Sequence, residues 1–442
     1  MRYTKEEILR IVEEEDVSFV RLQFVDVFGK LKNVAVTAAQ LPRALAGEVM
    51  IDGSSIDGFA AASDSDRYLI PDLSTFAVYP WRPSRGKVAR LMCDICQGDG
   101  APFGGDSRQV LQRVCDRAAA QGITMQVGPE CEFFLFHTDE EGRPTMNTTD
   151  QAGYFDIYPL DQGENVRREV VLALETLGFQ VECSHHENAP GQHEIDFKYA
   201  PAMEAADNIL TFQMAVKTLA QRNGLHATFM PKPIAGRAGS GMHLNFTLHR
   251  DGKNLFYDGA AEQGLSKEAR GFIAGVMAHI GGITAVTNPL VNSYKRLVPG
   301  FEAPCFTSWS FGNRTALMRI PMAKPGQIRV ELRSPDCCGN PYLALAVCLA
   351  AGLDGIERGL EAPPELKADP ASLTPEERAA LGVRPLPGNL QEALCALEQD
   401  ELLLDVLGEH IAEAYLSGKR REWEDYRGQV SEWERRRYMV AY

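Results

Sequence analysis

The sequence predicts a two-domain α+β protein whose larger domain is built on a mainly antiparallel sheet. Its 442 residues are too many for one simple hydrophobic core. The chain changes character at a turn-rich stretch, Gly-Asp-Gly-Ala-Pro at 98–102, so we expect domains at 1–105 and 106–442. Beyond that stretch, helical and strand patterns mix without the regular alternation of a doubly wound sheet, which favours the α+β class.

The composition is that of a soluble globular protein, with 45% apolar and 24% charged residues. Lys and Arg number 45 against 60 Asp and Glu, a net charge of −15. Such a charge argues against nucleic acid or an anionic membrane as a partner, because both would be repelled at long range. The chain starts without an apolar signal core, and its longest apolar run, 342–353, is too short to cross a bilayer. We therefore expect a cytoplasmic protein.

Ten cysteines are scattered through the chain, a pattern that indicates reduced thiols rather than a disulfide framework. Cys93 and Cys96 have the spacing of half a zinc or redox site, but no second pair matches it. We expect Cys337, Cys338 and Cys348 to be small buried fillers.

The first hundred residues predict one short helix followed by short strands. Thr4 and Glu7 have the spacing of a capping box, which starts a helix that reaches about Glu14. Apolar and polar residues alternate from 17 to 36 on either side of Phe28-Gly29-Lys30, the pattern of a β-hairpin. Residues 52–59 have the composition of a loop.

The rest of the chain carries longer helical patterns. We expect helices at about 107–121, 164–177, 202–222 and 266–286, and mostly helices from 340 onward. The tail at 422–437 has Glu and Arg at helical spacing and predicts one helix that faces solvent or another subunit.

Residues 128–136 form the stretch around which the chain is organised. They predict a buried strand that opens at a Gly-Pro turn. Alternation along a strand places Glu130 and Glu132 on one face, about 7 Å apart. Two such carboxylates repel each other and are costly to bury alone, so we expect a cation between them. A single Glu-x-Glu could equally lie at an exposed strand edge, but similar groups recur downstream.

Those groups are Glu187, Glu194, His243 and Glu331, all in strand-like contexts. With the first pair they make five glutamates and one histidine, enough for two cation sites of three ligands each. Mostly oxygen ligands favour a hard divalent ion, and a single imidazole for the pair of sites favours Mg²⁺ or Mn²⁺ over Ca²⁺ or Zn²⁺.

Arginines gather in the same part of the chain: Arg296, Arg314, Arg319, Arg329 and Arg333. Each alone could be a structural ion-pair partner. Together with metal ions they suit a polyphosphate and a carboxylate substrate, the parts that phosphoryl transfer requires. The chain has no P-loop motif, and the glycine-rich stretch 236–241 suits a loop that approaches a substrate closely.

These residues resemble bacterial type I glutamine synthetase nearly from end to end. The motifs are Asp-Gly-Ser-Ser-Ile at 52–56, Gly-Pro-Glu-Cys-Glu-Phe at 128–133, Ala-Pro-Gly-Gln-His-Glu at 189–194, Lys-Pro to Gly-Met-His at 232–243, Asn-Arg-Thr at 313–315, Arg-Val-Glu-Leu-Arg at 329–333 and Glu-Trp-Glu-Arg at 432–435. The resemblance implies an N-terminal β-grasp domain, a larger catalytic domain, and a dodecamer of two hexameric rings with active sites between subunits. It implies synthesis of L-glutamine from L-glutamate, ammonia and ATP through γ-glutamyl phosphate, in nitrogen assimilation.

The resemblance also implies roles for individual residues. One Mg²⁺ or Mn²⁺ would be held by Glu132, Glu187 and Glu194, and the other by Glu130, His243 and Glu331. The glutamate site would comprise Tyr154, Ala238, Gly239, Gly241, Arg296, Glu302, Arg314 and Arg333. ATP would contact Glu182, Asn245, Thr247, Arg314 and Arg319. The catalytic residues would be Asp52, Glu302, Arg314 and Arg333.

In this scheme Asp52 reaches in from the adjacent subunit, and Glu302 lies on a mobile flap at 292–304. Ammonium is the bulk species at pH 7, whereas the acyl phosphate is attacked by neutral ammonia. A carboxylate can both concentrate the cation and accept its proton. A closing flap would keep water from the acyl phosphate.

Two departures from the family concern regulation. The adenylylated branch carries a tyrosine near the level of 361–368, where this chain has Ala-Pro-Pro-Glu-Leu-Lys and no tyrosine. The shorter Bacillus-like branch is more similar, but it has a feedback arginine soon after its Asp-Gly-Ser-Ser-Ile motif. Here Phe-Ala-Ala-Ala-Ser follows at 59–63, with no arginine before Arg67, so we expect weakened or altered inhibition by glutamine.

Two other functions remain open on the sequence. The chain could be a γ-glutamyl ligase that uses a polyamine or another amine, although a carboxylate at Asp52 suits ammonium better. It could also be a silent relative that senses nitrogen status or binds regulatory proteins, although every expected metal and arginine position is present.

Overall fold

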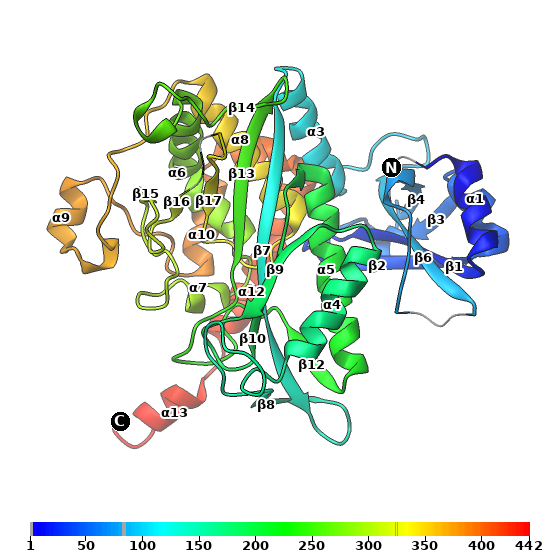
Figure 1. The fold of residues 1–442 in the computed structure, drawn as a ribbon, viewed down its shortest axis with the longest axis horizontal. Coiled ribbons are helices and arrows are strands. Elements are labelled where there is room, and N and C mark those ends of the chain that lie inside the picture. The colour runs from blue at the N-terminus through cyan, green and yellow to red at the C-terminus, as the bar shows by residue number, and fades with distance from the viewer. Residues whose placement is uncertain (1–2, 82–84, 323, 325) are drawn as a thin grey trace.

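The computed structural model describes residues 3–81, 85–322, 324 and 326–442; Met1 and Arg2, at the start considered above, lie outside this part. Two sheets organise the chain, a small one on the right of Figure 1 and a large one in its centre. Strand β6 of the small sheet ends at Cys96 and helix α3 begins at Ser107, so no regular element crosses residue 105. The domain boundary at that residue stays a prediction.

The N-terminal sheet has the strand order β2-β1-β6-β4-β3, with β5 paired to β6. Its neighbours are antiparallel except β1 and β6, which run parallel. Its strands are β1 (Val17–Val25), β2 (Leu31–Thr37), β3 (Val49–Asp52), β4 (Asp66–Pro71), β5 (Ala77–Val78) and β6 (Lys87–Cys96), with helices α1 (Lys5–Glu14) and α2 (Leu41–Leu45). The capping box of Thr4 and Glu7 and the hairpin of β1 and β2 confirm the predictions for this region.

The large sheet has the order β15-β16-β17-β13-β7-β10-β9. All its described pairings are antiparallel except that of β15 with β16, which confirms the predicted sheet type. Its strands are β7 (Thr124–Thr138), β8 (Pro144–Thr148), β9 (Val181–His186), β10 (Gln192–Phe197), β11 (Ala200–Pro201), β12 (Leu225–Thr228), β13 (Met242–Arg250), β14 (Lys253–Asn254), β15 (Trp309–Phe311), β16 (Met318–Ile320) and β17 (Val330–Leu332).

The predicted turn at Gly128-Pro129 is wrong, because β7 runs straight through these residues. Backbone N–H groups alternate sides along a strand. The Glu132 N–H donates toward β13, to Gly241, and the Leu135 N–H donates to the opposite side, to Gly191. The nitrogen of Pro129 therefore faces that opposite side, in the gap between the pairings of β10 and β11, where no ladder hydrogen bond is lost.

In Figure 1, α3, α4 and α5 are seen to the right of β7 and β13 and α6 and α8 to the left, and α8 packs against α3, α5 and α6. The first four predicted helices occur within two residues of their expected ends. The helices are α3 (Ser107–Ala119), α4 (Glu164–Thr176), α5 (Ala202–Arg222), α6 (Lys267–Thr287), α7 (Ser293–Arg296), α8 (Pro341–Glu357), α9 (Pro375–Ala380), α10 (Leu390–Glu398), α11 (Glu401–Leu407), α12 (Glu409–Arg427) and α13 (Glu432–Tyr438).

The tail departs from the prediction of one helix. It consists of α12 and the short α13, separated at 428–431. Ser431 caps α13 in a capping box with Glu434, so the local sequence starts a new helix there. Figure 1 shows α13 projecting away from the body of the molecule.

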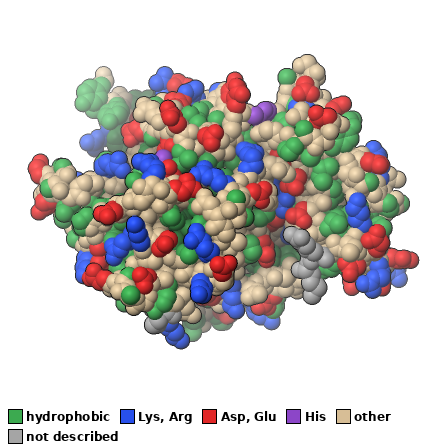
Figure 2. Space-filling model, turned by 90° about the horizontal axis from the view of Figure 1, so that it is seen from above, with side chains coloured by type: hydrophobic (Ala, Val, Ile, Leu, Met, Phe, Trp, Pro, Cys, Tyr) green, Lys and Arg blue, Asp and Glu red, His purple; other side chains and the backbone are tan. Residues whose placement is uncertain are grey.

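Helix α6 is a core element. It is long and apolar enough to cross a membrane by composition, but 78% of the relevant window is buried inside the fold. It packs against α8, whose residues from Pro341 to Leu353 are also buried. Outside this core, acidic and basic side chains are interspersed over the face drawn in Figure 2.

The two parts of the chain are tied by a buried cation. Arg108 on α3 forms ion pairs with Asp72 and Asp94 of the N-terminal sheet region at 2.6 and 2.7 Å, and with Asp207 of α5 at 3.2 Å. The Tyr342 hydroxyl donates to the same Asp207. This network holds the N-terminal sheet against the helices that support the large sheet.

The cysteines are all free thiols. Cys337 and Cys348 are buried as predicted, whereas Cys338 is only partly buried. Burial raises the pKa of the Cys93 thiol, and neither Cys93 nor Cys96 belongs to a potential metal-binding group of described residues.

Candidate functional site

The predicted ligands lie on one face of the large sheet because the strand register aligns them. Glu132 on β7 pairs with Glu194 on β10, and Glu130 pairs with His243 on β13. Glu331 on β17 pairs with Asn245, two residues beyond His243. Strand alternation then points this whole row of side chains to the same side.

A polar pocket of about 190 Å³ opens on this face. It is lined by most of the residues expected for metal ions and glutamate: Glu130, Glu132, Tyr154, Glu187, Glu194, Ala238, Gly239, His243, Arg296, Glu302, Arg314 and Arg333, with Asn188, Gln192, Phe301 and Ala303. Residues far apart in sequence therefore converge here.

Glu130, His243 and Glu331 form one tight group. Each offers a ligand atom, and these atoms lie within 4.8 Å of one another. His243 Nδ1 is buried without a hydrogen-bond partner in the described structure. Since a buried polar atom without a partner is costly, the group fits a cation.

A second tight group holds Glu187 and Glu194, and its third member is His185 rather than Glu132. His185 Nδ1 lies 3.6 Å from Glu187 and Nε2 lies 3.8 Å from Glu194. Glu132 lines the same pocket but accepts hydrogen bonds from Gln192 at 3.0 Å and from the Gly241 N–H at 2.8 Å. His185 was not among the predicted ligands, although it lies two residues before Glu187, the spacing that places two side chains on one face of a strand.

The carboxylates of the pocket differ in their electrostatic surroundings. Burial, with Glu331 nearby, raises the pKa of Glu130 to about 7. Burial and the adjacent Glu132 raise the pKa of Glu187 to about 7, and burial raises that of Glu194 well above its usual value. Three buried carboxyl groups therefore lack enough positive charge around them, which is the condition that a bound cation relieves.

Glu331 and Glu132 differ from these three, because neighbouring groups stabilise their charged forms despite burial. Burial opposes ionisation of Glu331, but Arg333 and Arg319 outweigh it and lower its pKa. Arg319 reaches Glu331 at 2.6 Å, and Arg333 pairs with its other oxygen. For Glu132, burial is outweighed by the combined effect of His243, Arg296 and the Gly241 N–H, which lower the pKa.

Two buried arginines form a wall of the pocket. Arg296 donates to the carbonyls of Ser334, Pro335 and Arg333 at 2.7, 3.2 and 3.1 Å. Arg333 donates from Nε to the Arg314 carbonyl at 2.9 Å. These contacts hold the guanidinium groups in place, whereas Arg314 itself is exposed.

Glycines make room for this wall. A Cβ on Gly241 would collide with the Arg296 guanidinium, and one on Gly239 would collide with the Pro231 carbonyl oxygen. The glycine-rich stretch 236–241 is thus a close-approach loop beside the pocket, as predicted.

The residues expected for ATP extend along the same strands. His243, Asn245 and Thr247 alternate along β13, and Asn245 donates to Glu130 at 2.8 Å. Asn245, Thr247, Arg319 and Glu182 do not line the pocket. Glu182 is an exposed residue at an irregularity where the pairing of β9 steps from Cys183 to Val181.

Glu302 and Tyr154 lie at the mouth of the pocket. Glu302 is exposed and has a positive φ of 55°. Tyr154 stacks on Phe155, with ring centroids 4.0 Å apart, and meets the edge of His185 at 5.6 Å. Lys232 lies over the ring of Phe301, the neighbour of Glu302, at 3.8 Å.

Asp52 is not brought to this pocket within one chain. It ends β3 in the N-terminal sheet, where its exposed carboxylate accepts hydrogen bonds from the Ser54 N–H and hydroxyl at 2.9 and 2.7 Å. In Figure 1, β3 lies well apart from β13 and β17.

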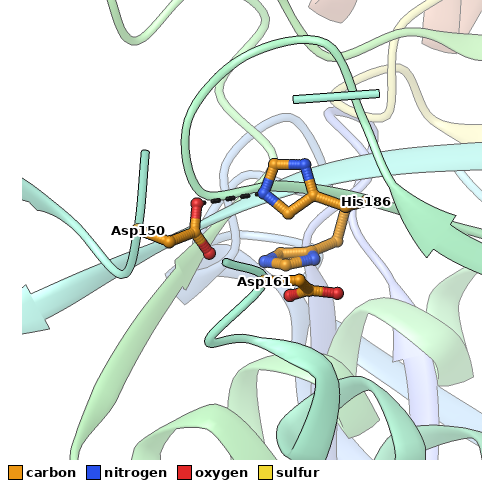
Figure 3. A group of neighbouring side chains, drawn as sticks. Asp150, Asp161 and His186 are labelled. Carbon is orange, nitrogen blue, oxygen red and sulfur yellow. Dashed lines mark hydrogen bonds and ion pairs between the residues drawn. The ribbon is translucent and has the colours of Figure 1, made fainter. Parts of the chain in front are cut away.

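Behind the pocket, on the opposite face of β9 and β10, lies a fully buried group that the sequence analysis did not identify: Asp150, Asp161, His186 and His193. His186 Nε2 lies 3.0 Å from Asp150 (Figure 3), and His186 Nδ1 lies 2.7 Å from the Glu187 carbonyl. Asp150 also accepts the Gly191 N–H at 2.9 Å. The network therefore holds both ends of the loop 187–191 that carries Glu187.

A cation is already built into this buried group. Arg167 pairs with Asp161 at 2.8 Å and donates toward His193 Nδ1 at 2.9 Å. Burial opposes a charged His186, but the hydrogen bonds with Asp150 and the Glu187 carbonyl, together with the charges of Asp150 and Asp161, outweigh it and raise the pKa. Each carboxylate thus has a positive partner, so the group is structural.

Comparisons with known proteins agree with this geometry. The sequence model described as "Glutamine synthetase, catalytic domain" matches residues 104–438, and "Glutamine synthetase, beta-Grasp domain" matches residues 16–98. A glutamine synthetase of Clostridium saccharobutylicum is 56% identical over 441 residues, covering 100% of both chains. One of Staphylococcus aureus (strain Mu50) is 51% identical and covers 100% of this chain and 99% of that protein.

Solved structures are similar throughout. A chain described as "GmaS/ADP complex-Conformation 1" is 36% identical, with a TM-score of 0.90 and full coverage of both chains. The cryo-EM structure of Plasmodium falciparum glutamine synthetase is 26% identical, with a TM-score of 0.85, and covers 100% of this chain and 99% of that one.

The N-terminal sheet is accordingly a β-grasp domain, and the larger α+β part is the catalytic domain. The bacterial relatives are consistent with the Bacillus-like type I branch. The family is ATP-dependent and uses divalent metals, which the two ligand groups of the pocket fit. Because both domain models and full-length relatives agree, this chain belongs to the glutamine synthetase family and makes L-glutamine from L-glutamate, ammonia and ATP.

Proposed function

We propose that the pocket on β7, β10, β13 and β17 performs this reaction in two steps through γ-glutamyl phosphate. The observation that carries the proposal is the set of buried carboxylates without positive partners, beside two arginines held by backbone carbonyls. Such a site attracts cations and then a polyphosphate, and it leaves fixed guanidinium groups for the charge that develops during transfer.

The metal ions would be Mg²⁺ or Mn²⁺, two for each site. Glu130, His243 and Glu331 would hold one. Glu132, Glu187 and Glu194 would hold the other, with His185 beside them. Divalent ions bound there would supply positive charge that neutralises the phosphates. The unpartnered His243 Nδ1 and the raised pKa values of Glu130, Glu187 and Glu194 support this assignment.

Glutamate would lie against the loop and the arginine wall, contacting Ala238, Gly239, Gly241, Arg296, Arg314 and Arg333, with Tyr154 at the mouth. The absence of a side chain at Gly241 lets the Arg296 guanidinium lie against the loop, where it would face the substrate. ATP would extend along β13 past Asn245 and Thr247, with Arg314, Arg319 and Glu182 as further contacts. The hydrogen bond from Asn245 to Glu130 supports a link between the nucleotide and metal parts.

Ammonium would be bound by Glu302 and by Asp52 of a neighbouring subunit. One of these carboxylates would take its proton before ammonia attacks the acyl phosphate. Arg314 and Arg333 would hold the phosphate charge. The flap 292–304 would exclude water when it closes over the intermediate.

A shared site requires an oligomer, and we propose the dodecamer of two hexameric rings. Asp52 lies outside its own chain's pocket, which supports completion of the site by a second subunit. The segment 154–160, which carries Tyr154 of the pocket, also exposes large apolar side chains, as subunit contacts do. They are Tyr154, Phe155, Ile157, Tyr158 and Leu160.

Complementation tests the shared site. Asp52→Ala and Glu331→Ala should each be inactive alone. Subunits of the two variants, mixed after dissociation and reassembled, should regain about a quarter of wild-type turnover in a random assembly, since one site in four then receives two intact halves. Mixtures with no more activity than their components would contradict the shared site.

We propose that this protein is not controlled by adenylylation. We also expect weakened or altered inhibition by glutamine, because Ala60, Ala61 and Ala62 occupy the region where the Bacillus-like branch has its feedback arginine. Strong inhibition by millimolar glutamine would contradict it. We retain the prediction of a cytoplasmic protein.

The decisive experiment measures phosphate release from Mg²⁺-ATP and glutamate with ammonium, putrescine or ethylamine. Release that depends on ammonium, with glutamine as product, is the expected result. Release only with a larger amine would indicate a γ-glutamyl-amine ligase, and no release would favour a sensor. Glu302→Ala should still form acyl phosphate but use ammonia poorly; equal loss of both steps would contradict its assigned role.

A further inference from the structure

A third set of potential ligands lies beside the pocket; it shares His185 with the second group, but its other members, Cys183 and Asp196, have no part in the proposed reaction. Cys183 and His185 alternate along β9, and the pairing with β10 sets Cys183 opposite Asp196 and His185 opposite Glu194. Cys183, His185 and Asp196 each offer a ligand atom, and these atoms lie within 4.8 Å of one another.

The atoms of this set are open to a ligand. The Cys183 thiol donates to one oxygen of Asp196 at 2.8 Å, while the other oxygen, Oδ1, is buried without a partner in the described structure. Cys183 is the one exposed cysteine among the ten. The set thus combines an accessible sulfur atom with a buried acceptor that nothing satisfies.

We propose that Cys183, His185 and Asp196 form a binding site for a thiophilic divalent cation of the Zn²⁺ type. Thiolate, imidazole and carboxylate are the ligands that Zn²⁺ prefers, whereas Mg²⁺ selects oxygen atoms. On binding, the thiol proton leaves to solvent. In a tetrahedral site with ordinary bond lengths, sulfur and oxygen lie about 3.6 Å apart, so the Cys183–Asp196 distance would open by under one ångström.

Occupation of this site would act on the reaction, a consequence that rests on the proposed function. His185 lies between Glu187 and Glu194 at 3.6 and 3.8 Å, and it cannot serve both groups. A thiophilic cation would therefore draw the imidazole away and add positive charge beside Glu194. We expect inhibition that excess Mg²⁺ or Mn²⁺ relieves in part.

Cobalt titration of the full-length, metal-free protein tests binding without any assay of activity. Co²⁺ bound to thiolate absorbs in the near ultraviolet by charge transfer. The band should appear in the wild type and in Cys395→Ala, a matched control on α10, and should be lost in Cys183→Ala. No band in the wild type, or an equal band in Cys183→Ala, would overturn the proposal.

Alkylation gives a second readout. Zn²⁺ in the presence of excess Mg²⁺ should slow the reaction of Cys183 with iodoacetamide at least tenfold, as followed by mass spectrometry of the modified peptide; unchanged alkylation would overturn the site. Cys183→Ala should keep basal synthetase activity and need at least tenfold more Zn²⁺ for half inhibition. If the cobalt and alkylation results hold but Zn²⁺ inhibits both proteins equally, the site stands and its link to the reaction fails.

Discussion

On one face of the β9–β10 pair Glu194 lies among other carboxylates, whereas on the opposite face Asp150 and Asp161 each lie beside a cation, His186 or Arg167. All three carboxyl groups are buried. On the first face burial raises the carboxyl pKa values, and on the second hydrogen bonds outweigh burial and lower the pKa of Asp150. Buried acidic groups without positive partners mark the place where a cation binds, and those with partners mark the support beneath it.

The largest effect should come from breaking a pair on the supporting face. Arg167→Met leaves Asp161, which is fully buried, without its positive partner. We expect a loss of about 3–5 kcal/mol in the free energy of unfolding, measured by denaturant titration. Arg168→Met, an exposed neighbour on α4, is the control and should change it by less than about 0.5 kcal/mol. Equal values for the two variants would contradict the comparison.

Neutralising a carboxylate on the pocket face should have the opposite effect on stability. Glu194→Gln removes like-charge repulsion, so metal-free protein should gain about 1 kcal/mol. Synthetase activity should fall at least about 100-fold, because the substitution removes a direct metal ligand. Loss of a residue that only supports such a ligand already costs about 10–100-fold. Glu175→Gln, on the exposed side of α4, should change neither quantity. A destabilised Glu194→Gln would show that this carboxylate is structural.

Stability should depend on pH through the same groups. The folded-state pKa values of Glu130 and Glu187, about 7, exceed their ordinary value of 4.5. Their contribution to stability is therefore fully present below about pH 4.5 and is lost as the pH rises through about 7. Metal-free protein should lose on the order of 2 kcal/mol for each of the two groups between pH 5 and 8.

Thermal unfolding with and without Mg²⁺ checks this expectation. The stabilisation by Mg²⁺ should increase over the same interval, since the ion binds the ionised carboxylates. A metal-free stability that stays constant or rises over this interval in the wild type, or a pH dependence unchanged in Glu187→Gln, would contradict the assignment.

The smallest effect should link the two faces. His186 holds the Glu187 carbonyl from below, so His186→Gln should loosen that ligand. We expect the Mg²⁺ concentration for half activation to rise about tenfold, with a smaller change in kcat at saturating Mg²⁺. Asp150→Asn should shift it in the same direction, and His226→Gln, on β12, should not. If the Mg²⁺ dependence is unchanged in both His186→Gln and Asp150→Asn, the buried network contributes to stability alone and not to metal binding.

Much of this organisation could be predicted from local patterns. The capping box of Thr4 and Glu7, the hairpin of β1 and β2, and the alternation of Glu130 and Glu132 depend on neighbouring residues, and the structure has them where expected. The Gly-Pro pair misled because a proline usually ends a strand, and its tolerance here depends on a gap between β10 and β11.

The sequence by itself therefore determined the types of ligand, their spacing within each strand and, through its long motifs, the family. Only the tertiary structure decided which ligands meet. The β10–β9 register sets His185 beside Glu194, and the folded chain places Arg167 beneath His193. Alternation fixes the face on which a side chain lies, but its partner depends on strand register, which is set by contacts between residues distant in the chain.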